Sequence, residues 1–140
     1  MRVEPYLYFN GRCEEAVDFY RRAIGAEVTM LTRFKDNPGT PAPAGAENNV
    51  MHASLRIGAT TLLASDGQGH GKPEFQGFSL SLTVPADTEA ERLFTALADD
   101  GRVQIPLSST PFASRFGMVV DRFGVSWTVA AYEQKASAKS

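Results

Sequence analysis

The chain has 140 residues, of which 43% are hydrophobic and 21% are charged, so its length favours one compact domain. Its 14 Lys and Arg residues against 16 Asp and Glu residues give a net charge of −2, with both signs spread along the chain. This balance argues against nucleic acid as a partner, because phosphate binding needs a dense basic face. No apolar run reaches the ~20 residues of a membrane helix, so no membrane partner is expected. The single cysteine, Cys13, is typical of a reducing, cytoplasmic location.

Two segments carry apolar residues at helical spacing. In residues 12–24, Ala16, Val17 and Tyr20 share one side, and Gly25 provides a stop. Residues 87–100 form the second predicted helix, with Asp87 or Thr88 as its N-cap and a stop at residue 101.

Strand patterns surround these helices. They lie at residues 3–9, 27–34, 50–57, 60–64, 78–84, 103–107, 116–121 and 125–131. Two long loops remain, at residues 35–49 and 66–77, and the second contains His70. The order of elements is strand, helix and three strands, given twice. This repeat predicts two packed modules, at about residues 1–66 and 77–132, within one domain over residues 1–132, followed by a polar tail at 133–140.

Several motifs together resemble the vicinal oxygen chelate superfamily, which comprises glyoxalases, bleomycin-resistance proteins and extradiol dioxygenases, and within it the PhnB-like branch. The motifs are Pro5-Tyr6-Leu7-Tyr8-Phe9-Asn10-Gly11, Cys13-Glu14-Glu15-Ala16, Phe19-Tyr20, His52-Ala53, and Asp121-Arg122-Phe123-Gly124-Val125-Ser126-Trp127. The resemblance implies an α+β fold of two βαβββ modules, with curved mixed sheets around a cavity, commonly in a homodimer. Some relatives carry a methyltransferase description related to ubiquinone synthesis, but no Gly-rich cofactor-binding turn follows the first strand.

Enzymes of this superfamily typically hold one divalent metal ion with His, Glu or Gln side chains. Nearby motifs map the four usual ligand positions onto side chains that are neither carboxylates nor imidazoles: Pro5, Leu62, Ser79 and Thr128. A divalent cation needs several such groups converging on it. We therefore predict neither a metal ion nor another cofactor, although the resemblance alone leaves a metal possible. In that case His52, Asp66 and Glu4 are the first ligands to consider.

Strand alternation predicts which side chains face the cavity. On this basis, with loop aromatics added at the mouth, the predicted ligand-binding residues are His52, Ser54, Arg56, Leu62, Asp66, Ser79, Ser81, Ser126, Thr128, Phe75, Phe112 and Phe116. The same alternation assigns Tyr6, Tyr8 and Trp127 to the helix side, as core residues.

His52 is the candidate catalytic residue, as a general base or an orienting donor, because histidine titrates near neutral pH. The alternative is a strand histidine bonded to a neighbour. Asp66 either orients His52 or Arg56 or caps the backbone amides of the loop that it begins. Cys13 is either a thiol with a pKa lowered by the helix N-terminus or a packed, inert one.

The favoured function is binding of a small organic ligand in the cavity without the family metal. The first alternative is a metal-dependent lyase, isomerase or dioxygenase of the glyoxalase type. The second is a dimerisation or partner module with a vestigial cavity.

Overall fold

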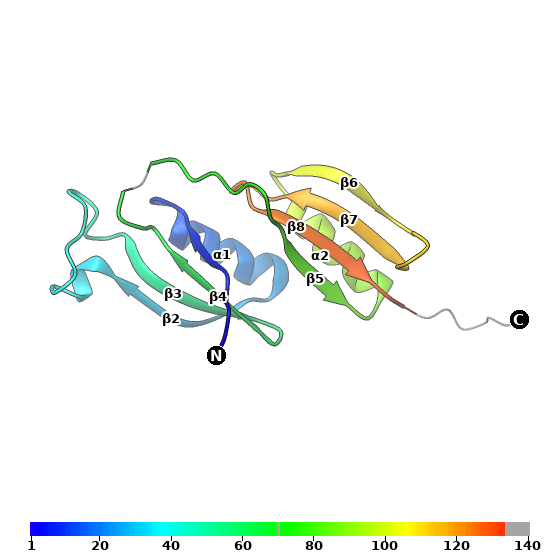
Figure 1. Cartoon of the computed structure of the whole chain (residues 1–140), viewed down its shortest axis with the longest axis horizontal. Coiled ribbons are helices and arrows are strands. Elements are labelled where there is room, and N and C mark those ends of the chain that lie inside the picture. Colours follow the sequence, from blue (N-terminus) through cyan, green and yellow to red (C-terminus); the bar gives the residue numbers. More distant parts are fainter. Residues whose placement is uncertain (70, 134–140) are drawn as a thin grey trace, which may run out of the picture. The chain divides into compact units, whose positions relative to one another are not determined.

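The computed structural model describes residues 1–69 and 71–133, so His70 and the tail from residue 134 onward lie outside the described residues. The chain divides into two compact units, Met1–Pro73 and Glu74–Ser140. Each unit contains one four-stranded mixed sheet and one α-helix, and Figure 1 shows each helix lying behind its own sheet.

The first unit, here called the first module, has the sheet order β1-β4-β3-β2. Strand β1 is parallel to β4, and the other pairs are antiparallel. The elements are β1 (Tyr6–Tyr8), α1 (Cys13–Ile24), β2 (Glu27–Arg33), the 3₁₀ turn η1 (Phe34–Asp36), β3 (Val50–Ile57) and β4 (Thr60–Ser65).

The second module repeats this topology with the order β5-β8-β7-β6, again with one parallel pair, β5 with β8. Its elements are β5 (Leu80–Val84), α2 (Asp87–Ala98), β6 (Arg102–Ser108), β7 (Arg115–Val120) and β8 (Ser126–Ala131). The fold prediction of two βαβββ modules is therefore confirmed.

Both helices form where the apolar spacing predicts them, and each buries the predicted stripe against its sheet. Helix α1 buries Ala16, Val17 and Tyr20, and Gly25 ends it in the left-handed conformation at φ 71°, which glycine adopts without strain. Helix α2 buries Leu93 and Leu97 among others. Each helix covers one face of its sheet, and we call the opposite face the open face of that module.

Some predicted boundaries differ from the structure. The first strand is limited to Tyr6–Tyr8, and η1 begins at Phe34 and runs into the segment expected to be a loop. Neither Asp87 nor Thr88 is the N-cap of α2. That position belongs to Ala86, whose side chain makes no capping bond. Instead, the carboxylate of Glu133 accepts a hydrogen bond from the backbone N–H of Asp87 at 2.7 Å.

Within residues 1–69 and 71–133, no helix is both long enough and apolar enough to span a bilayer.

Candidate functional site

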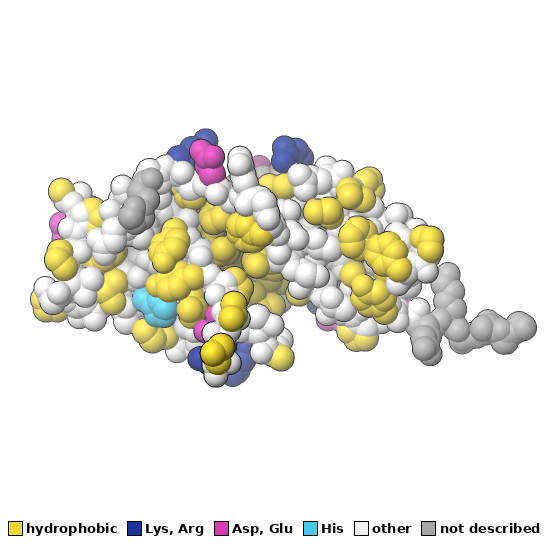
Figure 2. All heavy atoms as spheres, viewed as in Figure 1, with side chains coloured by type: hydrophobic (Ala, Val, Ile, Leu, Met, Phe, Trp, Pro, Cys, Tyr) yellow, Lys and Arg dark blue, Asp and Glu magenta, His cyan; other side chains and the backbone are white. Residues whose placement is uncertain are grey.

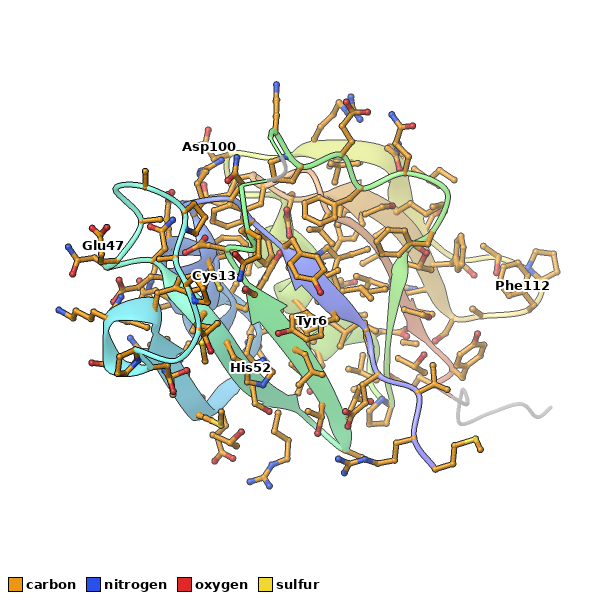
Figure 3. All side chains as sticks on the ribbon, turned by 60° about the vertical axis from the view of Figure 1, so that its left-hand side comes forward. Tyr6, Cys13, Glu47, His52, Asp100 and Phe112 are labelled. Atoms are coloured by element: carbon orange, nitrogen blue, oxygen red, sulfur yellow. The ribbon has the colours of Figure 1, made fainter. Side chains whose placement is uncertain are left out.

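Two tyrosines and a histidine meet on the open face of the first module. The hydroxyl of Tyr6, on β1, lies 2.7 Å from Nδ1 of His52, on β3. The Tyr6 and Tyr8 rings stack with centroids 4.9 Å apart and an interplanar angle of 9°, and the imidazole meets Tyr6 edge-on at 5.5 Å. Figure 3 shows Tyr6 and His52 turned toward one another across the sheet. We call Tyr6, Tyr8 and His52 the aromatic site.

Strand alternation explains why these side chains share the open face. Leu7, between the tyrosines, is 3% exposed on the helix side, whereas Tyr6 and Tyr8 are 38% and 47% exposed. The prediction that both tyrosines pack in the helix-side core is therefore wrong. The rings reach His52 because Tyr6 pairs with Leu63 on β4, which in turn pairs with Ser54 on β3.

The prediction that Leu62 faces the cavity is also wrong. Leu62 pairs directly with Leu55 across β3 and β4, and directly paired residues share one face. Both side chains are fully buried on the helix side. Because side chains alternate along a strand, the open face at this point carries Leu63 instead.

Asp66 caps backbone amides rather than orienting a side chain on the open face. It is 3% exposed, and its carboxylate accepts hydrogen bonds from the backbone N–H groups of Gly11, Cys13 and Val50 at 2.6, 2.8 and 2.8 Å. Cys13 is the first residue of α1, so the carboxylate lies at the positive end of that helix. Asp66 therefore caps backbone amides, although they belong to residues 11, 13 and 50 and not, as predicted, to the loop after Asp66, and Asp66 does not belong to the open face.

His52, Ser54 and Arg56 occupy alternate positions along β3, on the side opposite the buried Ala53 and Leu55. This is the face that alternation predicts for them. Arg56, at the end of the strand, forms a 2.5 Å ion pair with Glu27 on β2, so its charge is matched at the margin of the open face.

The open face of the second module is lined by hydroxyl groups. Ser79 and Thr128 lie with their hydroxyl oxygens 3.1 Å apart. Ser81 pairs with Thr128 across β5 and β8, and Ser126 lies two residues earlier on β8, so all four occupy the face that alternation predicts. Trp127, between Ser126 and Thr128, is buried as predicted and donates to Asp121 at 2.9 Å.

The three phenylalanines predicted at a cavity mouth belong to three different segments of the chain, and two of them contact one another. Phe116, on β7, shares the second open face because it pairs with Ala130 and Met118 pairs with Thr128. Phe112, at the β6–β7 loop, is 61% exposed and meets Phe116 edge-on at 5.2 Å. Phe75 is half-buried beside Gly124 in the β7–β8 turn.

Within residues 1–69 and 71–133, the side chains do not fit the divalent-metal site that the family resemblance implies. Among the described residues, no three His, Cys, Asp or Glu side chains gather in a geometry able to hold a metal ion. Of the side chains considered as ligands, the Asp66 carboxylate is bonded to backbone amides and Glu4 pairs with Arg2 at 3.4 Å, while His52 keeps only Nε2 available because its Nδ1 lies 2.7 Å from the Tyr6 hydroxyl. We therefore derive no chemical step through a metal.

Cys13 is packed inside the first module and fully buried. Burial raises the pKa of its thiol well above the usual range, and the nearby carboxylates of Asp66 and Glu14 raise it further. These effects outweigh the helix N-terminus, so a lowered pKa is not found and the inert interpretation holds.

Comparison with solved structures identifies the fold class. A glyoxylase/bleomycin resistance protein/dioxygenase domain from Frankia sp. EAN1pec superposes with a TM-score of 0.65 at 14% identity, covering 94% of each chain, which shows a shared fold alone. The chain therefore has the fold of the glyoxalase and bleomycin-resistance class.

Closer relatives define the family. A model of the 3-demethylubiquinone-9 3-methyltransferase family matches residues 1–130, so the chain belongs to that family, the PhnB-like one. Protein PA1353 from Pseudomonas aeruginosa is 41% identical, with a TM-score of 0.86 over 96% of this chain and 99% of that one. A PhnB protein from Bacillus cereus is 29% identical, with a TM-score of 0.78 over 94% of this chain and 99% of that one. Protein YjdN from Escherichia coli (strain K12) is 33% identical, over 96% of this chain and 98% of that one.

Sequence reasoning missed Tyr6, Tyr8 and one further residue of the first open face. Thr32 on β2 pairs with His52, and its hydroxyl oxygen is buried without a hydrogen-bond partner among the described residues. The sequence did contain a signal that the tyrosines could lie on the open face. A buried phenol needs a polar partner, and two tyrosines separated by one leucine point to the same face of a strand. The run Tyr6-Leu7-Tyr8-Phe9 is nevertheless hydrophobic throughout, so it does not show whether the tyrosines or the residues between them face the helix.

Proposed function

We propose that this protein binds a small organic ligand on the open faces of its sheets without a bound metal ion. The observation that carries the proposal is the aromatic site. Two stacked, exposed tyrosines and a half-buried imidazole share one face of the sheet, where they offer both a flat apolar surface and a polar edge. Binding sites of this chemistry combine a mainly apolar surface with a few fixed polar groups.

The second open face supports the same proposal. Its hydroxyls, at Ser79, Ser81, Ser126 and Thr128, accept and donate hydrogen bonds without carrying charge. Phe116 adds an apolar ring on that face. Such a surface suits a polar or amphipathic organic molecule better than a highly charged one.

Methyl transfer, the activity in the family's description, is not part of the proposal. Between β1 and α1 stand only Phe9, Asn10, Gly11 and Arg12, with a single glycine. A Gly-rich turn after the first strand, of the kind that holds a nucleotide cofactor at a helix N-terminus, is not formed by these residues.

We further propose that the protein acts as a cytoplasmic homodimer. The sheet-edge strands β2 and β6 each expose two apolar side chains, Val28 and Met30 on one and Val103 and Ile105 on the other. Exposed apolar edges are typical of surfaces that another chain covers. Light scattering of the purified protein measures the dimer directly.

A thermal-shift screen with aromatic antibiotics, phosphonates and oxo-acids tests ligand binding. A ligand at 100 times its Kd stabilises the folded protein by about 2.7 kcal/mol, which raises Tm by several degrees. Tyr8→Ala is expected to abolish the shift. Tyr132→Ala is the matched control, because Tyr132 is similarly exposed, at 54%, and lies outside the aromatic site and beyond the end of β8.

Two results would favour the alternatives. Stoichiometric Zn, Ni, Mn or Fe in protein purified without chelator would support a metal-dependent lyase, isomerase or dioxygenase. No thermal shift across the whole panel, together with a stable dimer, would support a dimerisation module with a vestigial cavity.

A further inference from the structure

The hydrogen bond between Tyr6 and His52 determines which edge of the imidazole is available to a ligand. Burial raises the pKa of the Tyr6 phenol, and Tyr8 and Cys13 raise it further, so Tyr6 is a neutral phenol with one hydrogen to donate. Its hydroxyl lies 2.7 Å from Nδ1 of His52. A neutral imidazole that accepts at Nδ1 carries its own proton on Nε2.

We propose, on the basis of the ligand-binding function above, that Tyr6 is a positioning residue that holds His52 in the Nε2–H tautomer. The resulting N–H donor selects a planar aromatic ligand that carries a carbonyl or carboxylate oxygen. The ring of such a ligand lies against the Tyr6–Tyr8 stack, and its oxygen accepts the hydrogen bond from His52.

The surroundings of His52 do not oppose an acceptor on the ligand. Along β3, Ser54 lies on the same face, and beyond it the Arg56–Glu27 ion pair brings no net charge. Thr32 lies opposite His52 on β2, but its hydroxyl oxygen is buried, so a ligand does not reach it. Because the hydroxyl of Ser54 both donates and accepts, the imidazole N–H is the group that selects an acceptor.

The imidazole is also accessible. His52 is only half-buried, and Figure 2 shows a histidine side chain, in cyan, at the surface with hydrophobic side chains beside it. Tyr8, with nearly half of its surface exposed, offers the flat area against which an aromatic ring can stack.

Nitrogen NMR tests the tautomer. Long-range ¹H–¹⁵N spectra are recorded at pH 8.5, above the range in which histidines usually titrate. His52→Gln assigns the signals, because the chain has two histidines. We expect His52 to be the Nε2–H tautomer, and Tyr6→Phe to convert it to a mixture of tautomers. A protonated Nδ1 in the unmodified protein, or an unchanged spectrum in Tyr6→Phe, overturns the inference.

Three matched ligands test the selectivity by calorimetry. 2-Naphthoate offers a planar ring and acceptor oxygens, 2-(aminomethyl)naphthalene offers the same ring with donors only, and decahydro-2-naphthoate offers the acceptors without planarity. We expect the first to bind about tenfold or more tightly than either other compound, the size of one charge-assisted hydrogen bond or one lost stacking contact. His52→Ala is expected to remove the preference for naphthoate over the amine, and Tyr6→Phe to reduce it severalfold.

The outcomes separate this inference from the proposed function. Equal binding of naphthoate and the amine, or a preference that survives His52→Ala, overturns the ligand class while binding itself stands. If no naphthalene binds but other compounds of the thermal-shift panel stabilise the protein, the ligand class again fails alone. If nothing binds in either experiment, both proposals fail.

Discussion

The first module presents aromatic rings, an imidazole and an ion pair on its open face, whereas the second presents uncharged hydroxyls beside Phe116. The helix-covered faces do not differ in this way. Both are apolar, with Leu55 and Leu62 in one module and Val129 and Trp127 in the other, all fully or nearly fully buried. Packing against a helix therefore restricts one face of each sheet to the same chemistry, while the open faces are free to differ.

The helix N-termini form a second contrast between the modules. In each, a carboxylate that follows the last strand accepts a hydrogen bond from the backbone N–H of the first helical residue: Asp66 for α1 and Glu133 for α2. Asp66 is buried and accepts two further backbone hydrogen bonds, whereas Glu133 is exposed. Both modules therefore cap the helix N-terminus with a carboxylate from beyond the last strand, but only in the first module is that carboxylate buried.

The largest expected effect tests which face each side chain of β4 occupies. Leu62→Ala leaves a cavity under α1 and is expected to lower the free energy of unfolding by about 2–5 kcal/mol. Leu63→Ala, one residue later on the open face, is expected to cost about 1 kcal/mol or less, because less of that side chain is buried. Urea denaturation measures both variants. Equal losses would show that the two faces are not distinguished as the strand pairing indicates.

The next effect tests the difference between the two caps. Asp66→Ala leaves three buried or partly buried backbone N–H groups without their acceptor, so a loss of about 2–4 kcal/mol is expected. Glu133→Ala removes one exposed hydrogen bond and is expected to cost at most about 1 kcal/mol. The same denaturation experiment compares them. A cost for Glu133→Ala that matches Asp66→Ala would contradict the contrast between the modules.

These contrasts also show which parts of the fold and of the candidate site could be predicted from the sequence. Helix spacing and the stop at Gly25 are local signals, so α1, α2 and the repeated order of elements could be predicted. The four hydroxyl residues on the second open face could also be placed, because polar and apolar residues alternate clearly in β5 and β8. The binding roles of these residues, and of Phe75 and Phe112, remain predictions.

The first open face was harder to predict because its strands carry weak alternation. In β1 every residue is apolar or aromatic, and in β4 Leu62 and Leu63 are adjacent and alike, so a shift of one residue exchanges the faces. The burial of Asp66 depends on amides at residues 11, 13 and 50, which are distant in sequence. Tertiary contacts of this kind leave no local pattern.

The smallest expected effect concerns pH and again belongs to the first module alone, because the buried Cys13 begins α1 whereas a half-buried Asp87 begins α2. The folded state raises the pKa of the Cys13 thiol, while an unfolded chain titrates it near 9.0. Below pH 9 both states keep the proton and the contribution to stability is complete. Above pH 9 the unfolded state loses the proton first, so it binds fewer protons and the free energy of unfolding falls as pH rises.

This contribution to the slope is at most about 1.4 kcal/mol per pH unit for one thiol. Lysines and tyrosines titrate in the same range, so the informative quantity is the difference between the unmodified protein and Cys13→Ala, measured by urea denaturation from pH 7 to 10.5. The packing lost in the variant is the same at every pH, and only the titration changes with pH. We expect the two stability curves to run parallel up to about pH 9 and to converge above it. Curves that stay parallel throughout would mean that the thiol ionises as easily in the folded protein as in the unfolded chain, which would contradict the raised pKa.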